Sequence, residues 1–166
     1  MHVFNRARLI KNSKNRIPYG VDLIQKYKRE SWIVFTENKK QAKQFNKIIN
    51  TKGFKSALYN TDLDSSERLE NLTKFKNGDL NVLVTCTALD EGFDMPEADG
   101  ALILSASSSK RQRVQRMGRV LRITENKPNA LIVTVYSSKT EFDKLMDEAK
   151  RYHKEGVPVS WKRQDR

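Results

Sequence analysis

Five short apolar runs alternate with helix-like segments along most of the chain, and this alternation most constrains the possible fold. The runs cover residues 32–36, 56–59, 81–85, 101–104 and 129–136. Between them, apolar residues recur every three or four positions, as Ala42, Phe45 and Ile49 do, which is the spacing of an amphipathic helix. Buried strands separated by such helices predict a mostly parallel sheet with helices on both faces. We therefore expect an α/β protein.

Capping residues predict the ends of the first two helices. Pro18 suits the first turn of a helix that extends to about residue 29. Asn38 is a preferred N-cap residue for the next helix, and Gly53 suits the end of that helix, where a left-handed backbone is common. These signals place one helix on either side of the 32–36 run.

Two further helices are predicted from capping and periodicity. Asp64, with Glu67 three residues later, forms an N-terminal capping pattern, and Gly78 marks the end of that helix. The expected buried face of this helix consists of Leu69, Leu72 and Phe75. The last helix covers residues 141–153, and its expected inner face consists of Phe142, Leu145, Met146 and Ala149.

The strong positive charge of the chain predicts a polyanionic partner. The 166 residues carry 32 Lys and Arg against 20 Asp and Glu, so the net charge is +12, and nucleic acid is the first candidate partner. The length suits one domain. We expect a basic N-terminal arm or linker over residues 1–16, one domain over residues 17–155 and an irregular tail over residues 156–166. The charge of the arm comes from Arg6, Arg8, Lys11, Lys14 and Arg16.

Other features limit the chemistry and the location. Cys86 is the only cysteine, which excludes an internal disulfide framework and fits a reducing compartment. The only histidines are His2 and His153, so no His/Cys metal cluster is expected. The sequence shows no apolar run of about 18 residues and no signal-peptide pattern. We expect no metal site, no membrane partner, and a cytoplasmic, nucleoid-associated or nucleus-associated protein that is not secreted.

The most distinctive charged segment is Val114–Arg122. As a helix it separates into an apolar face of Val114, Met117 and Leu121 and a polar face of Gln115, Gly118, Arg119 and Arg122. A glycine within a helix costs about 1 kcal/mol relative to alanine, so its presence suggests close approach of a ligand to the backbone. Two arginines beside it favour an anionic ligand, because guanidinium groups match phosphate oxygens. A solvated basic helix face would explain the same charges.

Three stretches resemble, in this order and spacing, motifs IV, V and VI of superfamily 2 helicases. They are Trp32–Glu37, Val82–Pro96 and Gln115–Arg122. The segment 60–78 is also similar to the family's helix between motifs IV and V, and the resemblance extends over residues 30–138. It implies the second RecA-like lobe of a two-lobe motor, with a RecA-like three-layer sandwich as its fold.

The resemblance implies roles for the arginine segment. Arg119 and Arg122 would be the catalytic arginine fingers that reach the γ-phosphate across the cleft between the lobes. In other phosphoryl-transfer enzymes such a finger contributes about 10³–10⁵ in rate. Gln115 and Arg116 would connect the finger helix to the nucleotide.

The resemblance also implies nucleotide contacts in motif V. Glu91, Gly92 and Asp94 would lie at the face between the lobes, with Asp94 near the ribose. Taken without the resemblance, Asp90, Glu91 and Asp94 are more simply interpreted as turn and helix-cap carboxylates. The form Glu91–Asp94 is closer to that of repair and restriction-type translocases than to that of DEAD-box RNA helicases, which favours DNA over RNA.

Nucleic-acid contacts are implied for three threonines. Thr36 lies in motif IV, and Thr85 or Thr87 in motif V would hold a backbone phosphate together with nearby amides. Many motors of this family have Thr or Ser where Cys86 stands. Because a thiol is a poor hydrogen-bond donor, the phosphate role passes to its threonine neighbours.

The chain lacks the other half of an ATP site. None of its seven glycines belongs to a G-x-x-x-x-G-K-[ST] loop, and no acidic pair follows a strand in the context that Mg²⁺ binding needs. ATP with Mg²⁺ would be bound mainly by a first RecA-like lobe, in the same or a separate chain. We expect no ATP hydrolysis by this polypeptide alone.

The sequence therefore predicts the second lobe of an ATP-dependent DNA helicase or translocase, which supplies arginine fingers and part of the nucleic-acid surface. The alternative is a non-catalytic module that binds nucleic acid or a helicase, and that acts by completing or blocking a partner. A third reading, an unrelated α/β phosphate-binding enzyme, lacks a convincing catalytic acid or base. The chain fits either an excised lobe of a longer helicase or a natural stand-alone lobe.

Overall fold

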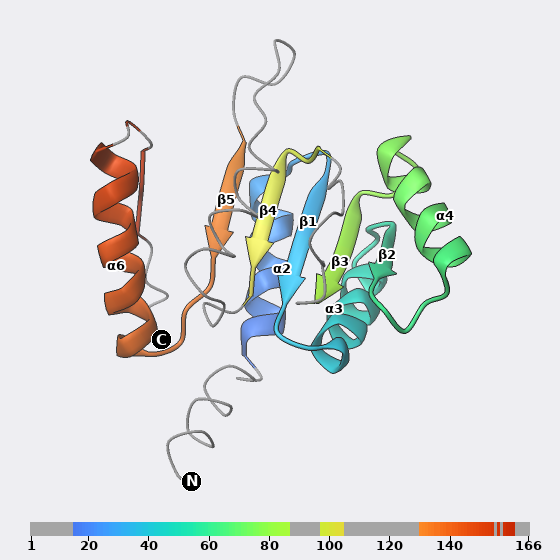
Figure 1. Ribbon diagram of the computed structural model, residues 1–166, viewed down its shortest axis with the longest axis horizontal. Helices are drawn as coiled ribbons and strands as arrows, with labels where there is room; N and C mark the ends of the chain where they lie inside the picture. The colour runs from blue at the N-terminus through green and yellow to red at the C-terminus, as the bar shows by residue number, and fades with distance from the viewer. Residues whose placement is uncertain (1–14, 87–96, 105–129, 155, 157, 162–166) are drawn as a thin grey trace, which may run out of the picture.

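A five-stranded parallel sheet forms the centre of the protein. The computed structural model describes residues 15–86, 97–104, 130–154, 156 and 158–161. The strands are β1 (Trp32–Thr36), β2 (Ser56–Tyr59), β3 (Val82–Cys86), β4 (Gly100–Ile103) and β5 (Leu131–Thr134). They lie in the order β2-β3-β1-β4-β5, and every adjacent pair is parallel (Figure 1). The predicted α/β class and parallel sheet are confirmed.

Helices cover both faces of this sheet, as predicted. The described helices are α2 (Arg16–Tyr27), α3 (Lys39–Thr51), α4 (Ser65–Lys76) and α6 (Lys139–Lys154). Side chains of α2 and α3 join alternate β1 residues, Trp32 and Val34, in one core. Those of α4 join Ile33 and Phe35 in a second core on the other face. Helix α6 lies beyond the β5 edge of the sheet (Figure 1). The arrangement is a three-layer sandwich.

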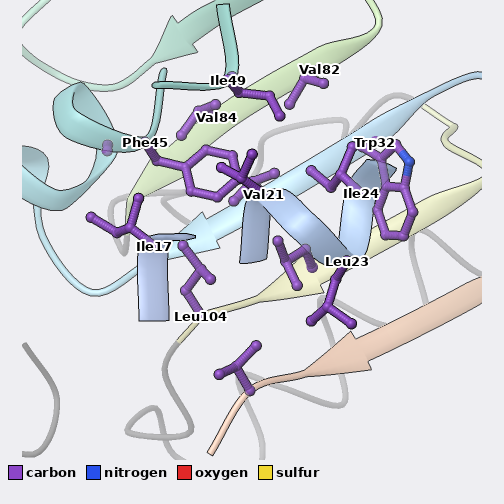
Figure 2. Packing of buried hydrophobic residues seen from close by; sticks show 14 of the residues in the cluster. Ile17, Val21, Leu23, Ile24, Trp32, Phe45, Ile49, Val82, Val84 and Leu104 are labelled. Atoms are coloured by element: carbon purple, nitrogen blue, oxygen red, sulfur yellow. The ribbon is translucent and has the colours of Figure 1, made fainter. Parts of the chain in front are cut away.

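The larger core lies under α2 and α3. Figure 2 shows Val21 and Ile24 of α2 and Phe45 of α3 converging on the same face of the strands. All three side chains are buried. Trp32 is fully buried in the same core and lies directly across from Gly100 in the β1–β4 pairing. A Cβ atom on Gly100 would lie only 2.6–2.8 Å from three atoms of the Trp32 ring. Glycine at position 100 therefore leaves the space beside β4 that the indole occupies.

The predicted caps of α3 and α4 are confirmed. The Asn38 side chain accepts a hydrogen bond from the Gln41 amide at 2.9 Å. That of Asp64 accepts one from the Glu67 amide at 2.7 Å. Gly53 has a φ of 86°, and its amide bonds the carbonyl of Asn50, so the left-handed end predicted for α3 is present.

The inner faces of α4 and α6 were predicted less well. Leu72 and Phe75 are buried, but Leu69 is 64% exposed, so its assignment to the buried face was wrong. Three-residue spacing drifts by about 60° per step around a helix, which carries Leu69 off a narrow apolar stripe. On α6, Leu145 and Ala149 are buried, whereas Phe142 and Met146 are only partly so.

Arg16 tethers the start of α2 to the carboxyl ends of β4 and β5. Its Nη1 donates hydrogen bonds to the Leu104 carbonyl at 2.7 Å and to the Val135 carbonyl at 3.2 Å. Its Nη2 lies 2.6 Å from Ser137 Oγ and 2.5 Å from Glu141 Oε2 at the start of α6. Arg16 is 2% exposed. Its guanidinium therefore joins segments 88 to 125 residues apart in sequence.

This position corrects the sequence reading of Arg16, which grouped it with the solvated arginines and lysines of the arm. The residue is instead the buried first residue of α2. Residues 1–14 of the arm lie outside the described residues, and the domain boundaries stay a prediction. A buried guanidinium needs a charged partner and several acceptors. Nothing near Arg16 in the sequence indicates that Glu141 supplies the charge.

Substitution of Gly100 by alanine should destabilise the protein by about 1–3 kcal/mol, because the new methyl group has no space beside the Trp32 ring. Urea denaturation of the two chains measures the change. In a Trp32→Leu background the cost of Gly100→Ala should shrink, since the smaller side chain yields the space. An equal cost in both backgrounds would show that the indole is not the cause.

Arg16→Ala should cost about 3–5 kcal/mol of stability, because it leaves the Glu141 carboxylate buried without its cation. Arg16→Lys should fall between this variant and the wild type, since an ammonium keeps the charge but not the fork of donors. Lys26→Ala on the exposed side of the same helix is the control and should change stability by less than about 0.5 kcal/mol. Denaturant unfolding measures these free energies. An equally small loss of stability in Arg16→Ala and in Lys26→Ala would show that Arg16 does not tether these segments.

Candidate nucleotide and nucleic-acid site

The carboxyl ends of the strands define the candidate site. Because the sheet is parallel, all five strands end at one edge, and ligands of open α/β sheets bind beyond that edge. The final residues of the strands there are Thr36, Tyr59, Cys86, Ile103 and Thr134. The predicted motifs follow β1, β3 and β4, which are neighbours in the sheet.

Eight of the ten predicted site residues lie outside the described residues. They are Thr87, Glu91, Gly92, Asp94, Gln115, Arg116, Arg119 and Arg122. Their roles stay predictions. What the sheet does fix is where their segments leave it: residues 87–96 follow β3, and residues 105–129 follow Leu104 at the end of β4. Since β3 and β4 flank β1, both segments start at the same edge, one on each side of the central strand.

The two described site residues, Thr36 and Thr85, are buried at this edge. They are 3% and 2% exposed. Thr36 Oγ1 lies 3.0 Å from the Thr85 carbonyl oxygen and 3.2 Å from that of Asn38, and Thr85 Oγ1 donates to the Cys86 carbonyl. In this conformation both hydroxyls bind backbone carbonyls, and that of Thr36 links β1 to β3. A direct phosphate contact would require each hydroxyl to exchange its partner, and that role stays a prediction.

Exposed positive charge at this edge comes from α3, which follows β1 directly. Four lysines and no acid lie within this helix, and all four are exposed: Lys39, Lys40, Lys43 and Lys47. Asp62, in the loop after β2, forms ion pairs with Lys39 and with Lys43, the latter at 3.1 Å. Hydrogen bonds from Lys39 and then Lys43 hold the pKa of the Asp62 carboxyl below its usual value.

The sequence reading missed this lysine–aspartate group. The available signal was the charge of the 39–47 segment, which carries lysines without a single acid. The pairing with Asp62 could not be read, because it depends on β2 and β1 both ending at the same edge with β3 between them.

Two further residues near this edge, Asp64 and Tyr59, have shifted pKa values, and the cause of each shift is structural. The backbone N–H of Glu67 holds the pKa of the Asp64 carboxyl below its usual value, as expected of an N-cap. Burial raises the pKa of the Tyr59 phenol, and the positive charge of Arg68 opposes this rise. These shifts therefore do not identify a general acid or base.

Metal-binding clusters and membrane spans were sought in the same parts of the chain. Residues 15–86, 97–104 and 130–154 hold no group of three or more His, Cys, Asp or Glu that could bind a metal ion. None of the described helices has the length and apolar character needed to cross a bilayer.

Arg16 is a second residue whose place at the edge the sequence did not reveal. It binds the carbonyl of Leu104, the last described residue before the segment that carries Arg119 and Arg122. Its partner Glu141 Oε2 also accepts the Ser137 amide at 2.9 Å. The ends of β4 and β5 are thus fixed to the start of α2 at the point where the arginine segment begins.

Comparison with known proteins agrees with this architecture. The helicase conserved C-terminal domain family matches residues 15–124, more than half of the chain. The "DNA 3'-5' translocase XPB2" of Sulfurisphaera tokodaii is 36% identical over 129 residues, covering 78% of this chain and 28% of the relative. The "ATP-dependent rRNA helicase RRP3" of Scheffersomyces stipitis is 25% identical over 118 residues, covering 71% of this chain and 24% of the relative. The chain thus spans less than a third of these relatives.

Solved structures show the same fold. The C-terminal domain of the DEAD-box protein Dbp5 superposes with a TM-score of 0.74 over 87% of this chain and 82% of that domain, at 22% identity. Such helicase C-terminal domains are RecA-like, so the predicted RecA-like sandwich is confirmed. With the family match over residues 15–124 and a relative at 36% identity, the chain belongs to the C-terminal helicase domains of superfamily 2.

Proposed function

We propose that this chain acts as the second RecA-like lobe of an ATP-dependent DNA helicase or translocase. The observation that supports the proposal is that the two strands preceding the motif-bearing segments, β3 and β4, end at one edge of the sheet. Residues 87–96 and 105–129 both leave that edge, on either side of β1, in a chain of the C-terminal helicase family. This placement favours motif V and the arginine segment acting together on one ligand at a lobe interface.

Arg119 and Arg122 are the proposed catalytic groups. Arginine keeps its charge at any physiological pH and offers donors that match phosphate oxygens. Gln115, Arg116, Glu91, Gly92 and Asp94 are the proposed nucleotide contacts of this lobe. The chain fits only one side of an ATP site, because the sequence has no phosphate loop and no acidic pair in the context that Mg²⁺ binding needs. The first lobe, in the same or a separate chain, would bind most of the ATP and its Mg²⁺.

DNA is the proposed nucleic acid. The translocase with 36% identity is named for DNA, whereas the rRNA helicase matches at 25%. The sequence of the segment Glu91–Asp94, which is more similar to that of repair and restriction-type translocases than to that of DEAD-box RNA helicases, also favours DNA. Contacts to backbone phosphate are favoured over reading of bases, since the net charge is +12 and the exposed face of α3 carries lysines without aromatic side chains.

The alternative function is a non-catalytic module that binds nucleic acid or completes a partner helicase. The observation in its favour is the charge: phosphate binding needs cations, and α3 supplies four lysines without any finger chemistry. The two functions differ in what Arg119 and Arg122 do, so variants of these residues separate them.

Replacing both arginines, Arg119→Ala with Arg122→Ala, should abolish DNA-stimulated ATPase activity when this lobe is paired with its first lobe. We expect turnover to fall by about 10³ or more, as when a finger is removed from other phosphoryl-transfer enzymes, while DNA affinity stays within about twofold. A coupled ATPase assay and DNA titration measure the two quantities.

The matched control is Lys150→Ala with Arg151→Ala, which removes the same charge from exposed positions on α6. This control should retain ATPase activity. A binding module would give the opposite pattern for the Arg119 and Arg122 variant: reduced DNA affinity, a smaller salt dependence and no specific effect on turnover.

The 166-residue chain alone should hydrolyse no ATP, with or without DNA, because it lacks the phosphate loop and the acidic pair. Phosphate release above the buffer blank, at micromolar protein, is the measurement. Adding the first lobe should restore turnover. DNA-stimulated turnover by the pure chain would refute the half-site interpretation.

A further inference from the structure

Helix α3 carries exposed lysines at its N-terminal end, where helices usually favour acidic residues. The first turn of α3 contains Lys39 and Lys40 and no acid. The N-terminal end of a helix carries partial positive charge, so lysines there are unfavourable unless an anion is close. Lys43 lies one turn beyond Lys39 on the same face. The face therefore needs a counter-anion, and it lies where α3 follows β1 at the carboxyl edge.

Within the described structure, Asp62 supplies that anion. Its Oδ1 accepts a hydrogen bond from Lys39 Nζ, and its Oδ2 lies 3.1 Å from Lys43 Nζ. One oxygen on each ammonium is an arrangement that two oxygens of a phosphate can also make. The pKa of the Asp62 carboxyl is held below its usual value by these lysines, so the carboxylate stays charged throughout the neutral range.

The loop after β2 holds Asp62 in this position. The side-chain oxygen of Asn60 accepts the Asp62 amide at 2.9 Å, and the Asn60 carbonyl accepts the Leu63 amide at 3.3 Å. Asn60 is 3% exposed, which anchors the turn in the body of the protein. Such a turn fixes the backbone of its third residue. The turn at Asn60 therefore holds the backbone of Asp62 where its carboxylate reaches the lysines of α3.

We propose that Asp62 is a built-in competitor for the nucleic-acid backbone. Its carboxylate occupies Lys39 and Lys43, and a backbone phosphate binds these lysines only by displacing it. This inference rests on the proposed function, in which the lobe contacts backbone phosphate. The Lys39 and Lys43 side chains are 45% and 59% exposed, and the Asp62 side chain is 34% exposed. Exposed ion pairs of this kind are weak, whereas a polyanion gains from counterion release.

Displacement of this kind makes each phosphate contact weak and easily exchanged. A lobe that moves along a strand must release every contact it makes, and an internal anion speeds that release by replacing the departing phosphate. The same competition lowers the salt dependence of binding, because in the complexes where Lys39 and Lys43 stay paired with Asp62 they neutralise no phosphate and release no counterions from the nucleic acid.

The test compares wild type with Asp62→Asn in the 166-residue chain. Binding of a fluorescein-labelled oligothymidylate is followed by anisotropy across a salt series. Asp62→Asn should bind about two- to fivefold more tightly at low salt. Its plot of log affinity against log salt should steepen by about 0.7 for each lysine freed, so by up to about 1.4. Asparagine keeps the shape of the side chain at an exposed position, and circular dichroism checks the fold.

The matched control is Asp147→Asn on α6. Asp147 is also exposed and also pairs with a lysine, Lys150, at 3.5 Å. Its replacement changes the net charge by the same amount, so a general charge effect would strengthen binding equally in both variants. Competition by Asp62 predicts a larger gain for Asp62→Asn.

A chain without the two lysines tests whether the effect of Asp62→Asn acts through them. In a chain with Lys39→Ala and Lys43→Ala, Asp62→Asn should have no more effect than Asp147→Asn. A gain from Asp62→Asn that equals the control in the wild-type background, or that persists without the two lysines, would overturn the inference while leaving the proposed function standing. Failure of every variant, wild type included, to bind oligothymidylate would instead reject the nucleic-acid part of the proposed function, and the inference with it.

Discussion

Burial of β1 on both faces is the constraint on which the rest of the structure depends. All five residues of this strand are at most 3% exposed, and β1 pairs with both β3 and β4. Trp32 and Val34 enter one core, and Ile33 and Phe35 enter the other. Such a strand is stable only with helices above and below it. The same strand ends at Thr36, so the packing that forms the core also fixes the edge at which β1, β3 and β4 end.

Features that depend on nearby residues could be predicted from the sequence. Strands came from apolar runs, and the caps of α3 and α4 came from Asn38 and Asp64, because an N-cap bonds an amide only three residues away. Leu69 was misplaced because periodicity gives the direction of a helix face only to within about a residue. Strand ends moved by one or two positions for the same local reason, as at β5, which is shorter than predicted.

Features that depend on distant residues could not be predicted. Arg16 reaches Glu141 across 125 positions, and Asp62 reaches Lys39 and Lys43 across β3, whose place between β2 and β1 is a property of the topology. In the sequence, each of these residues reads as an ordinary solvated charge. The roles of the motif residues came from the family resemblance, and the sheet adds where their segments begin. Thr36 and Thr85 show the limit of that transfer, since their hydroxyls bind backbone in this structure.

Two ion-pair systems at the same edge differ in solvent exposure, and this difference determines what each can do. The Arg16–Glu141 pair has side chains 1% and 11% exposed, so separating the two would leave each charge without its oppositely charged partner in a poorly solvated place. It can fix the ends of β4 and β5 but cannot exchange partners. Asp62 and its lysines remain in contact with water, so separating them exchanges protein contacts for hydration at little cost. Fixed ends of β4 and β5 and the proposed exchangeable phosphate contact can therefore coexist on one small domain.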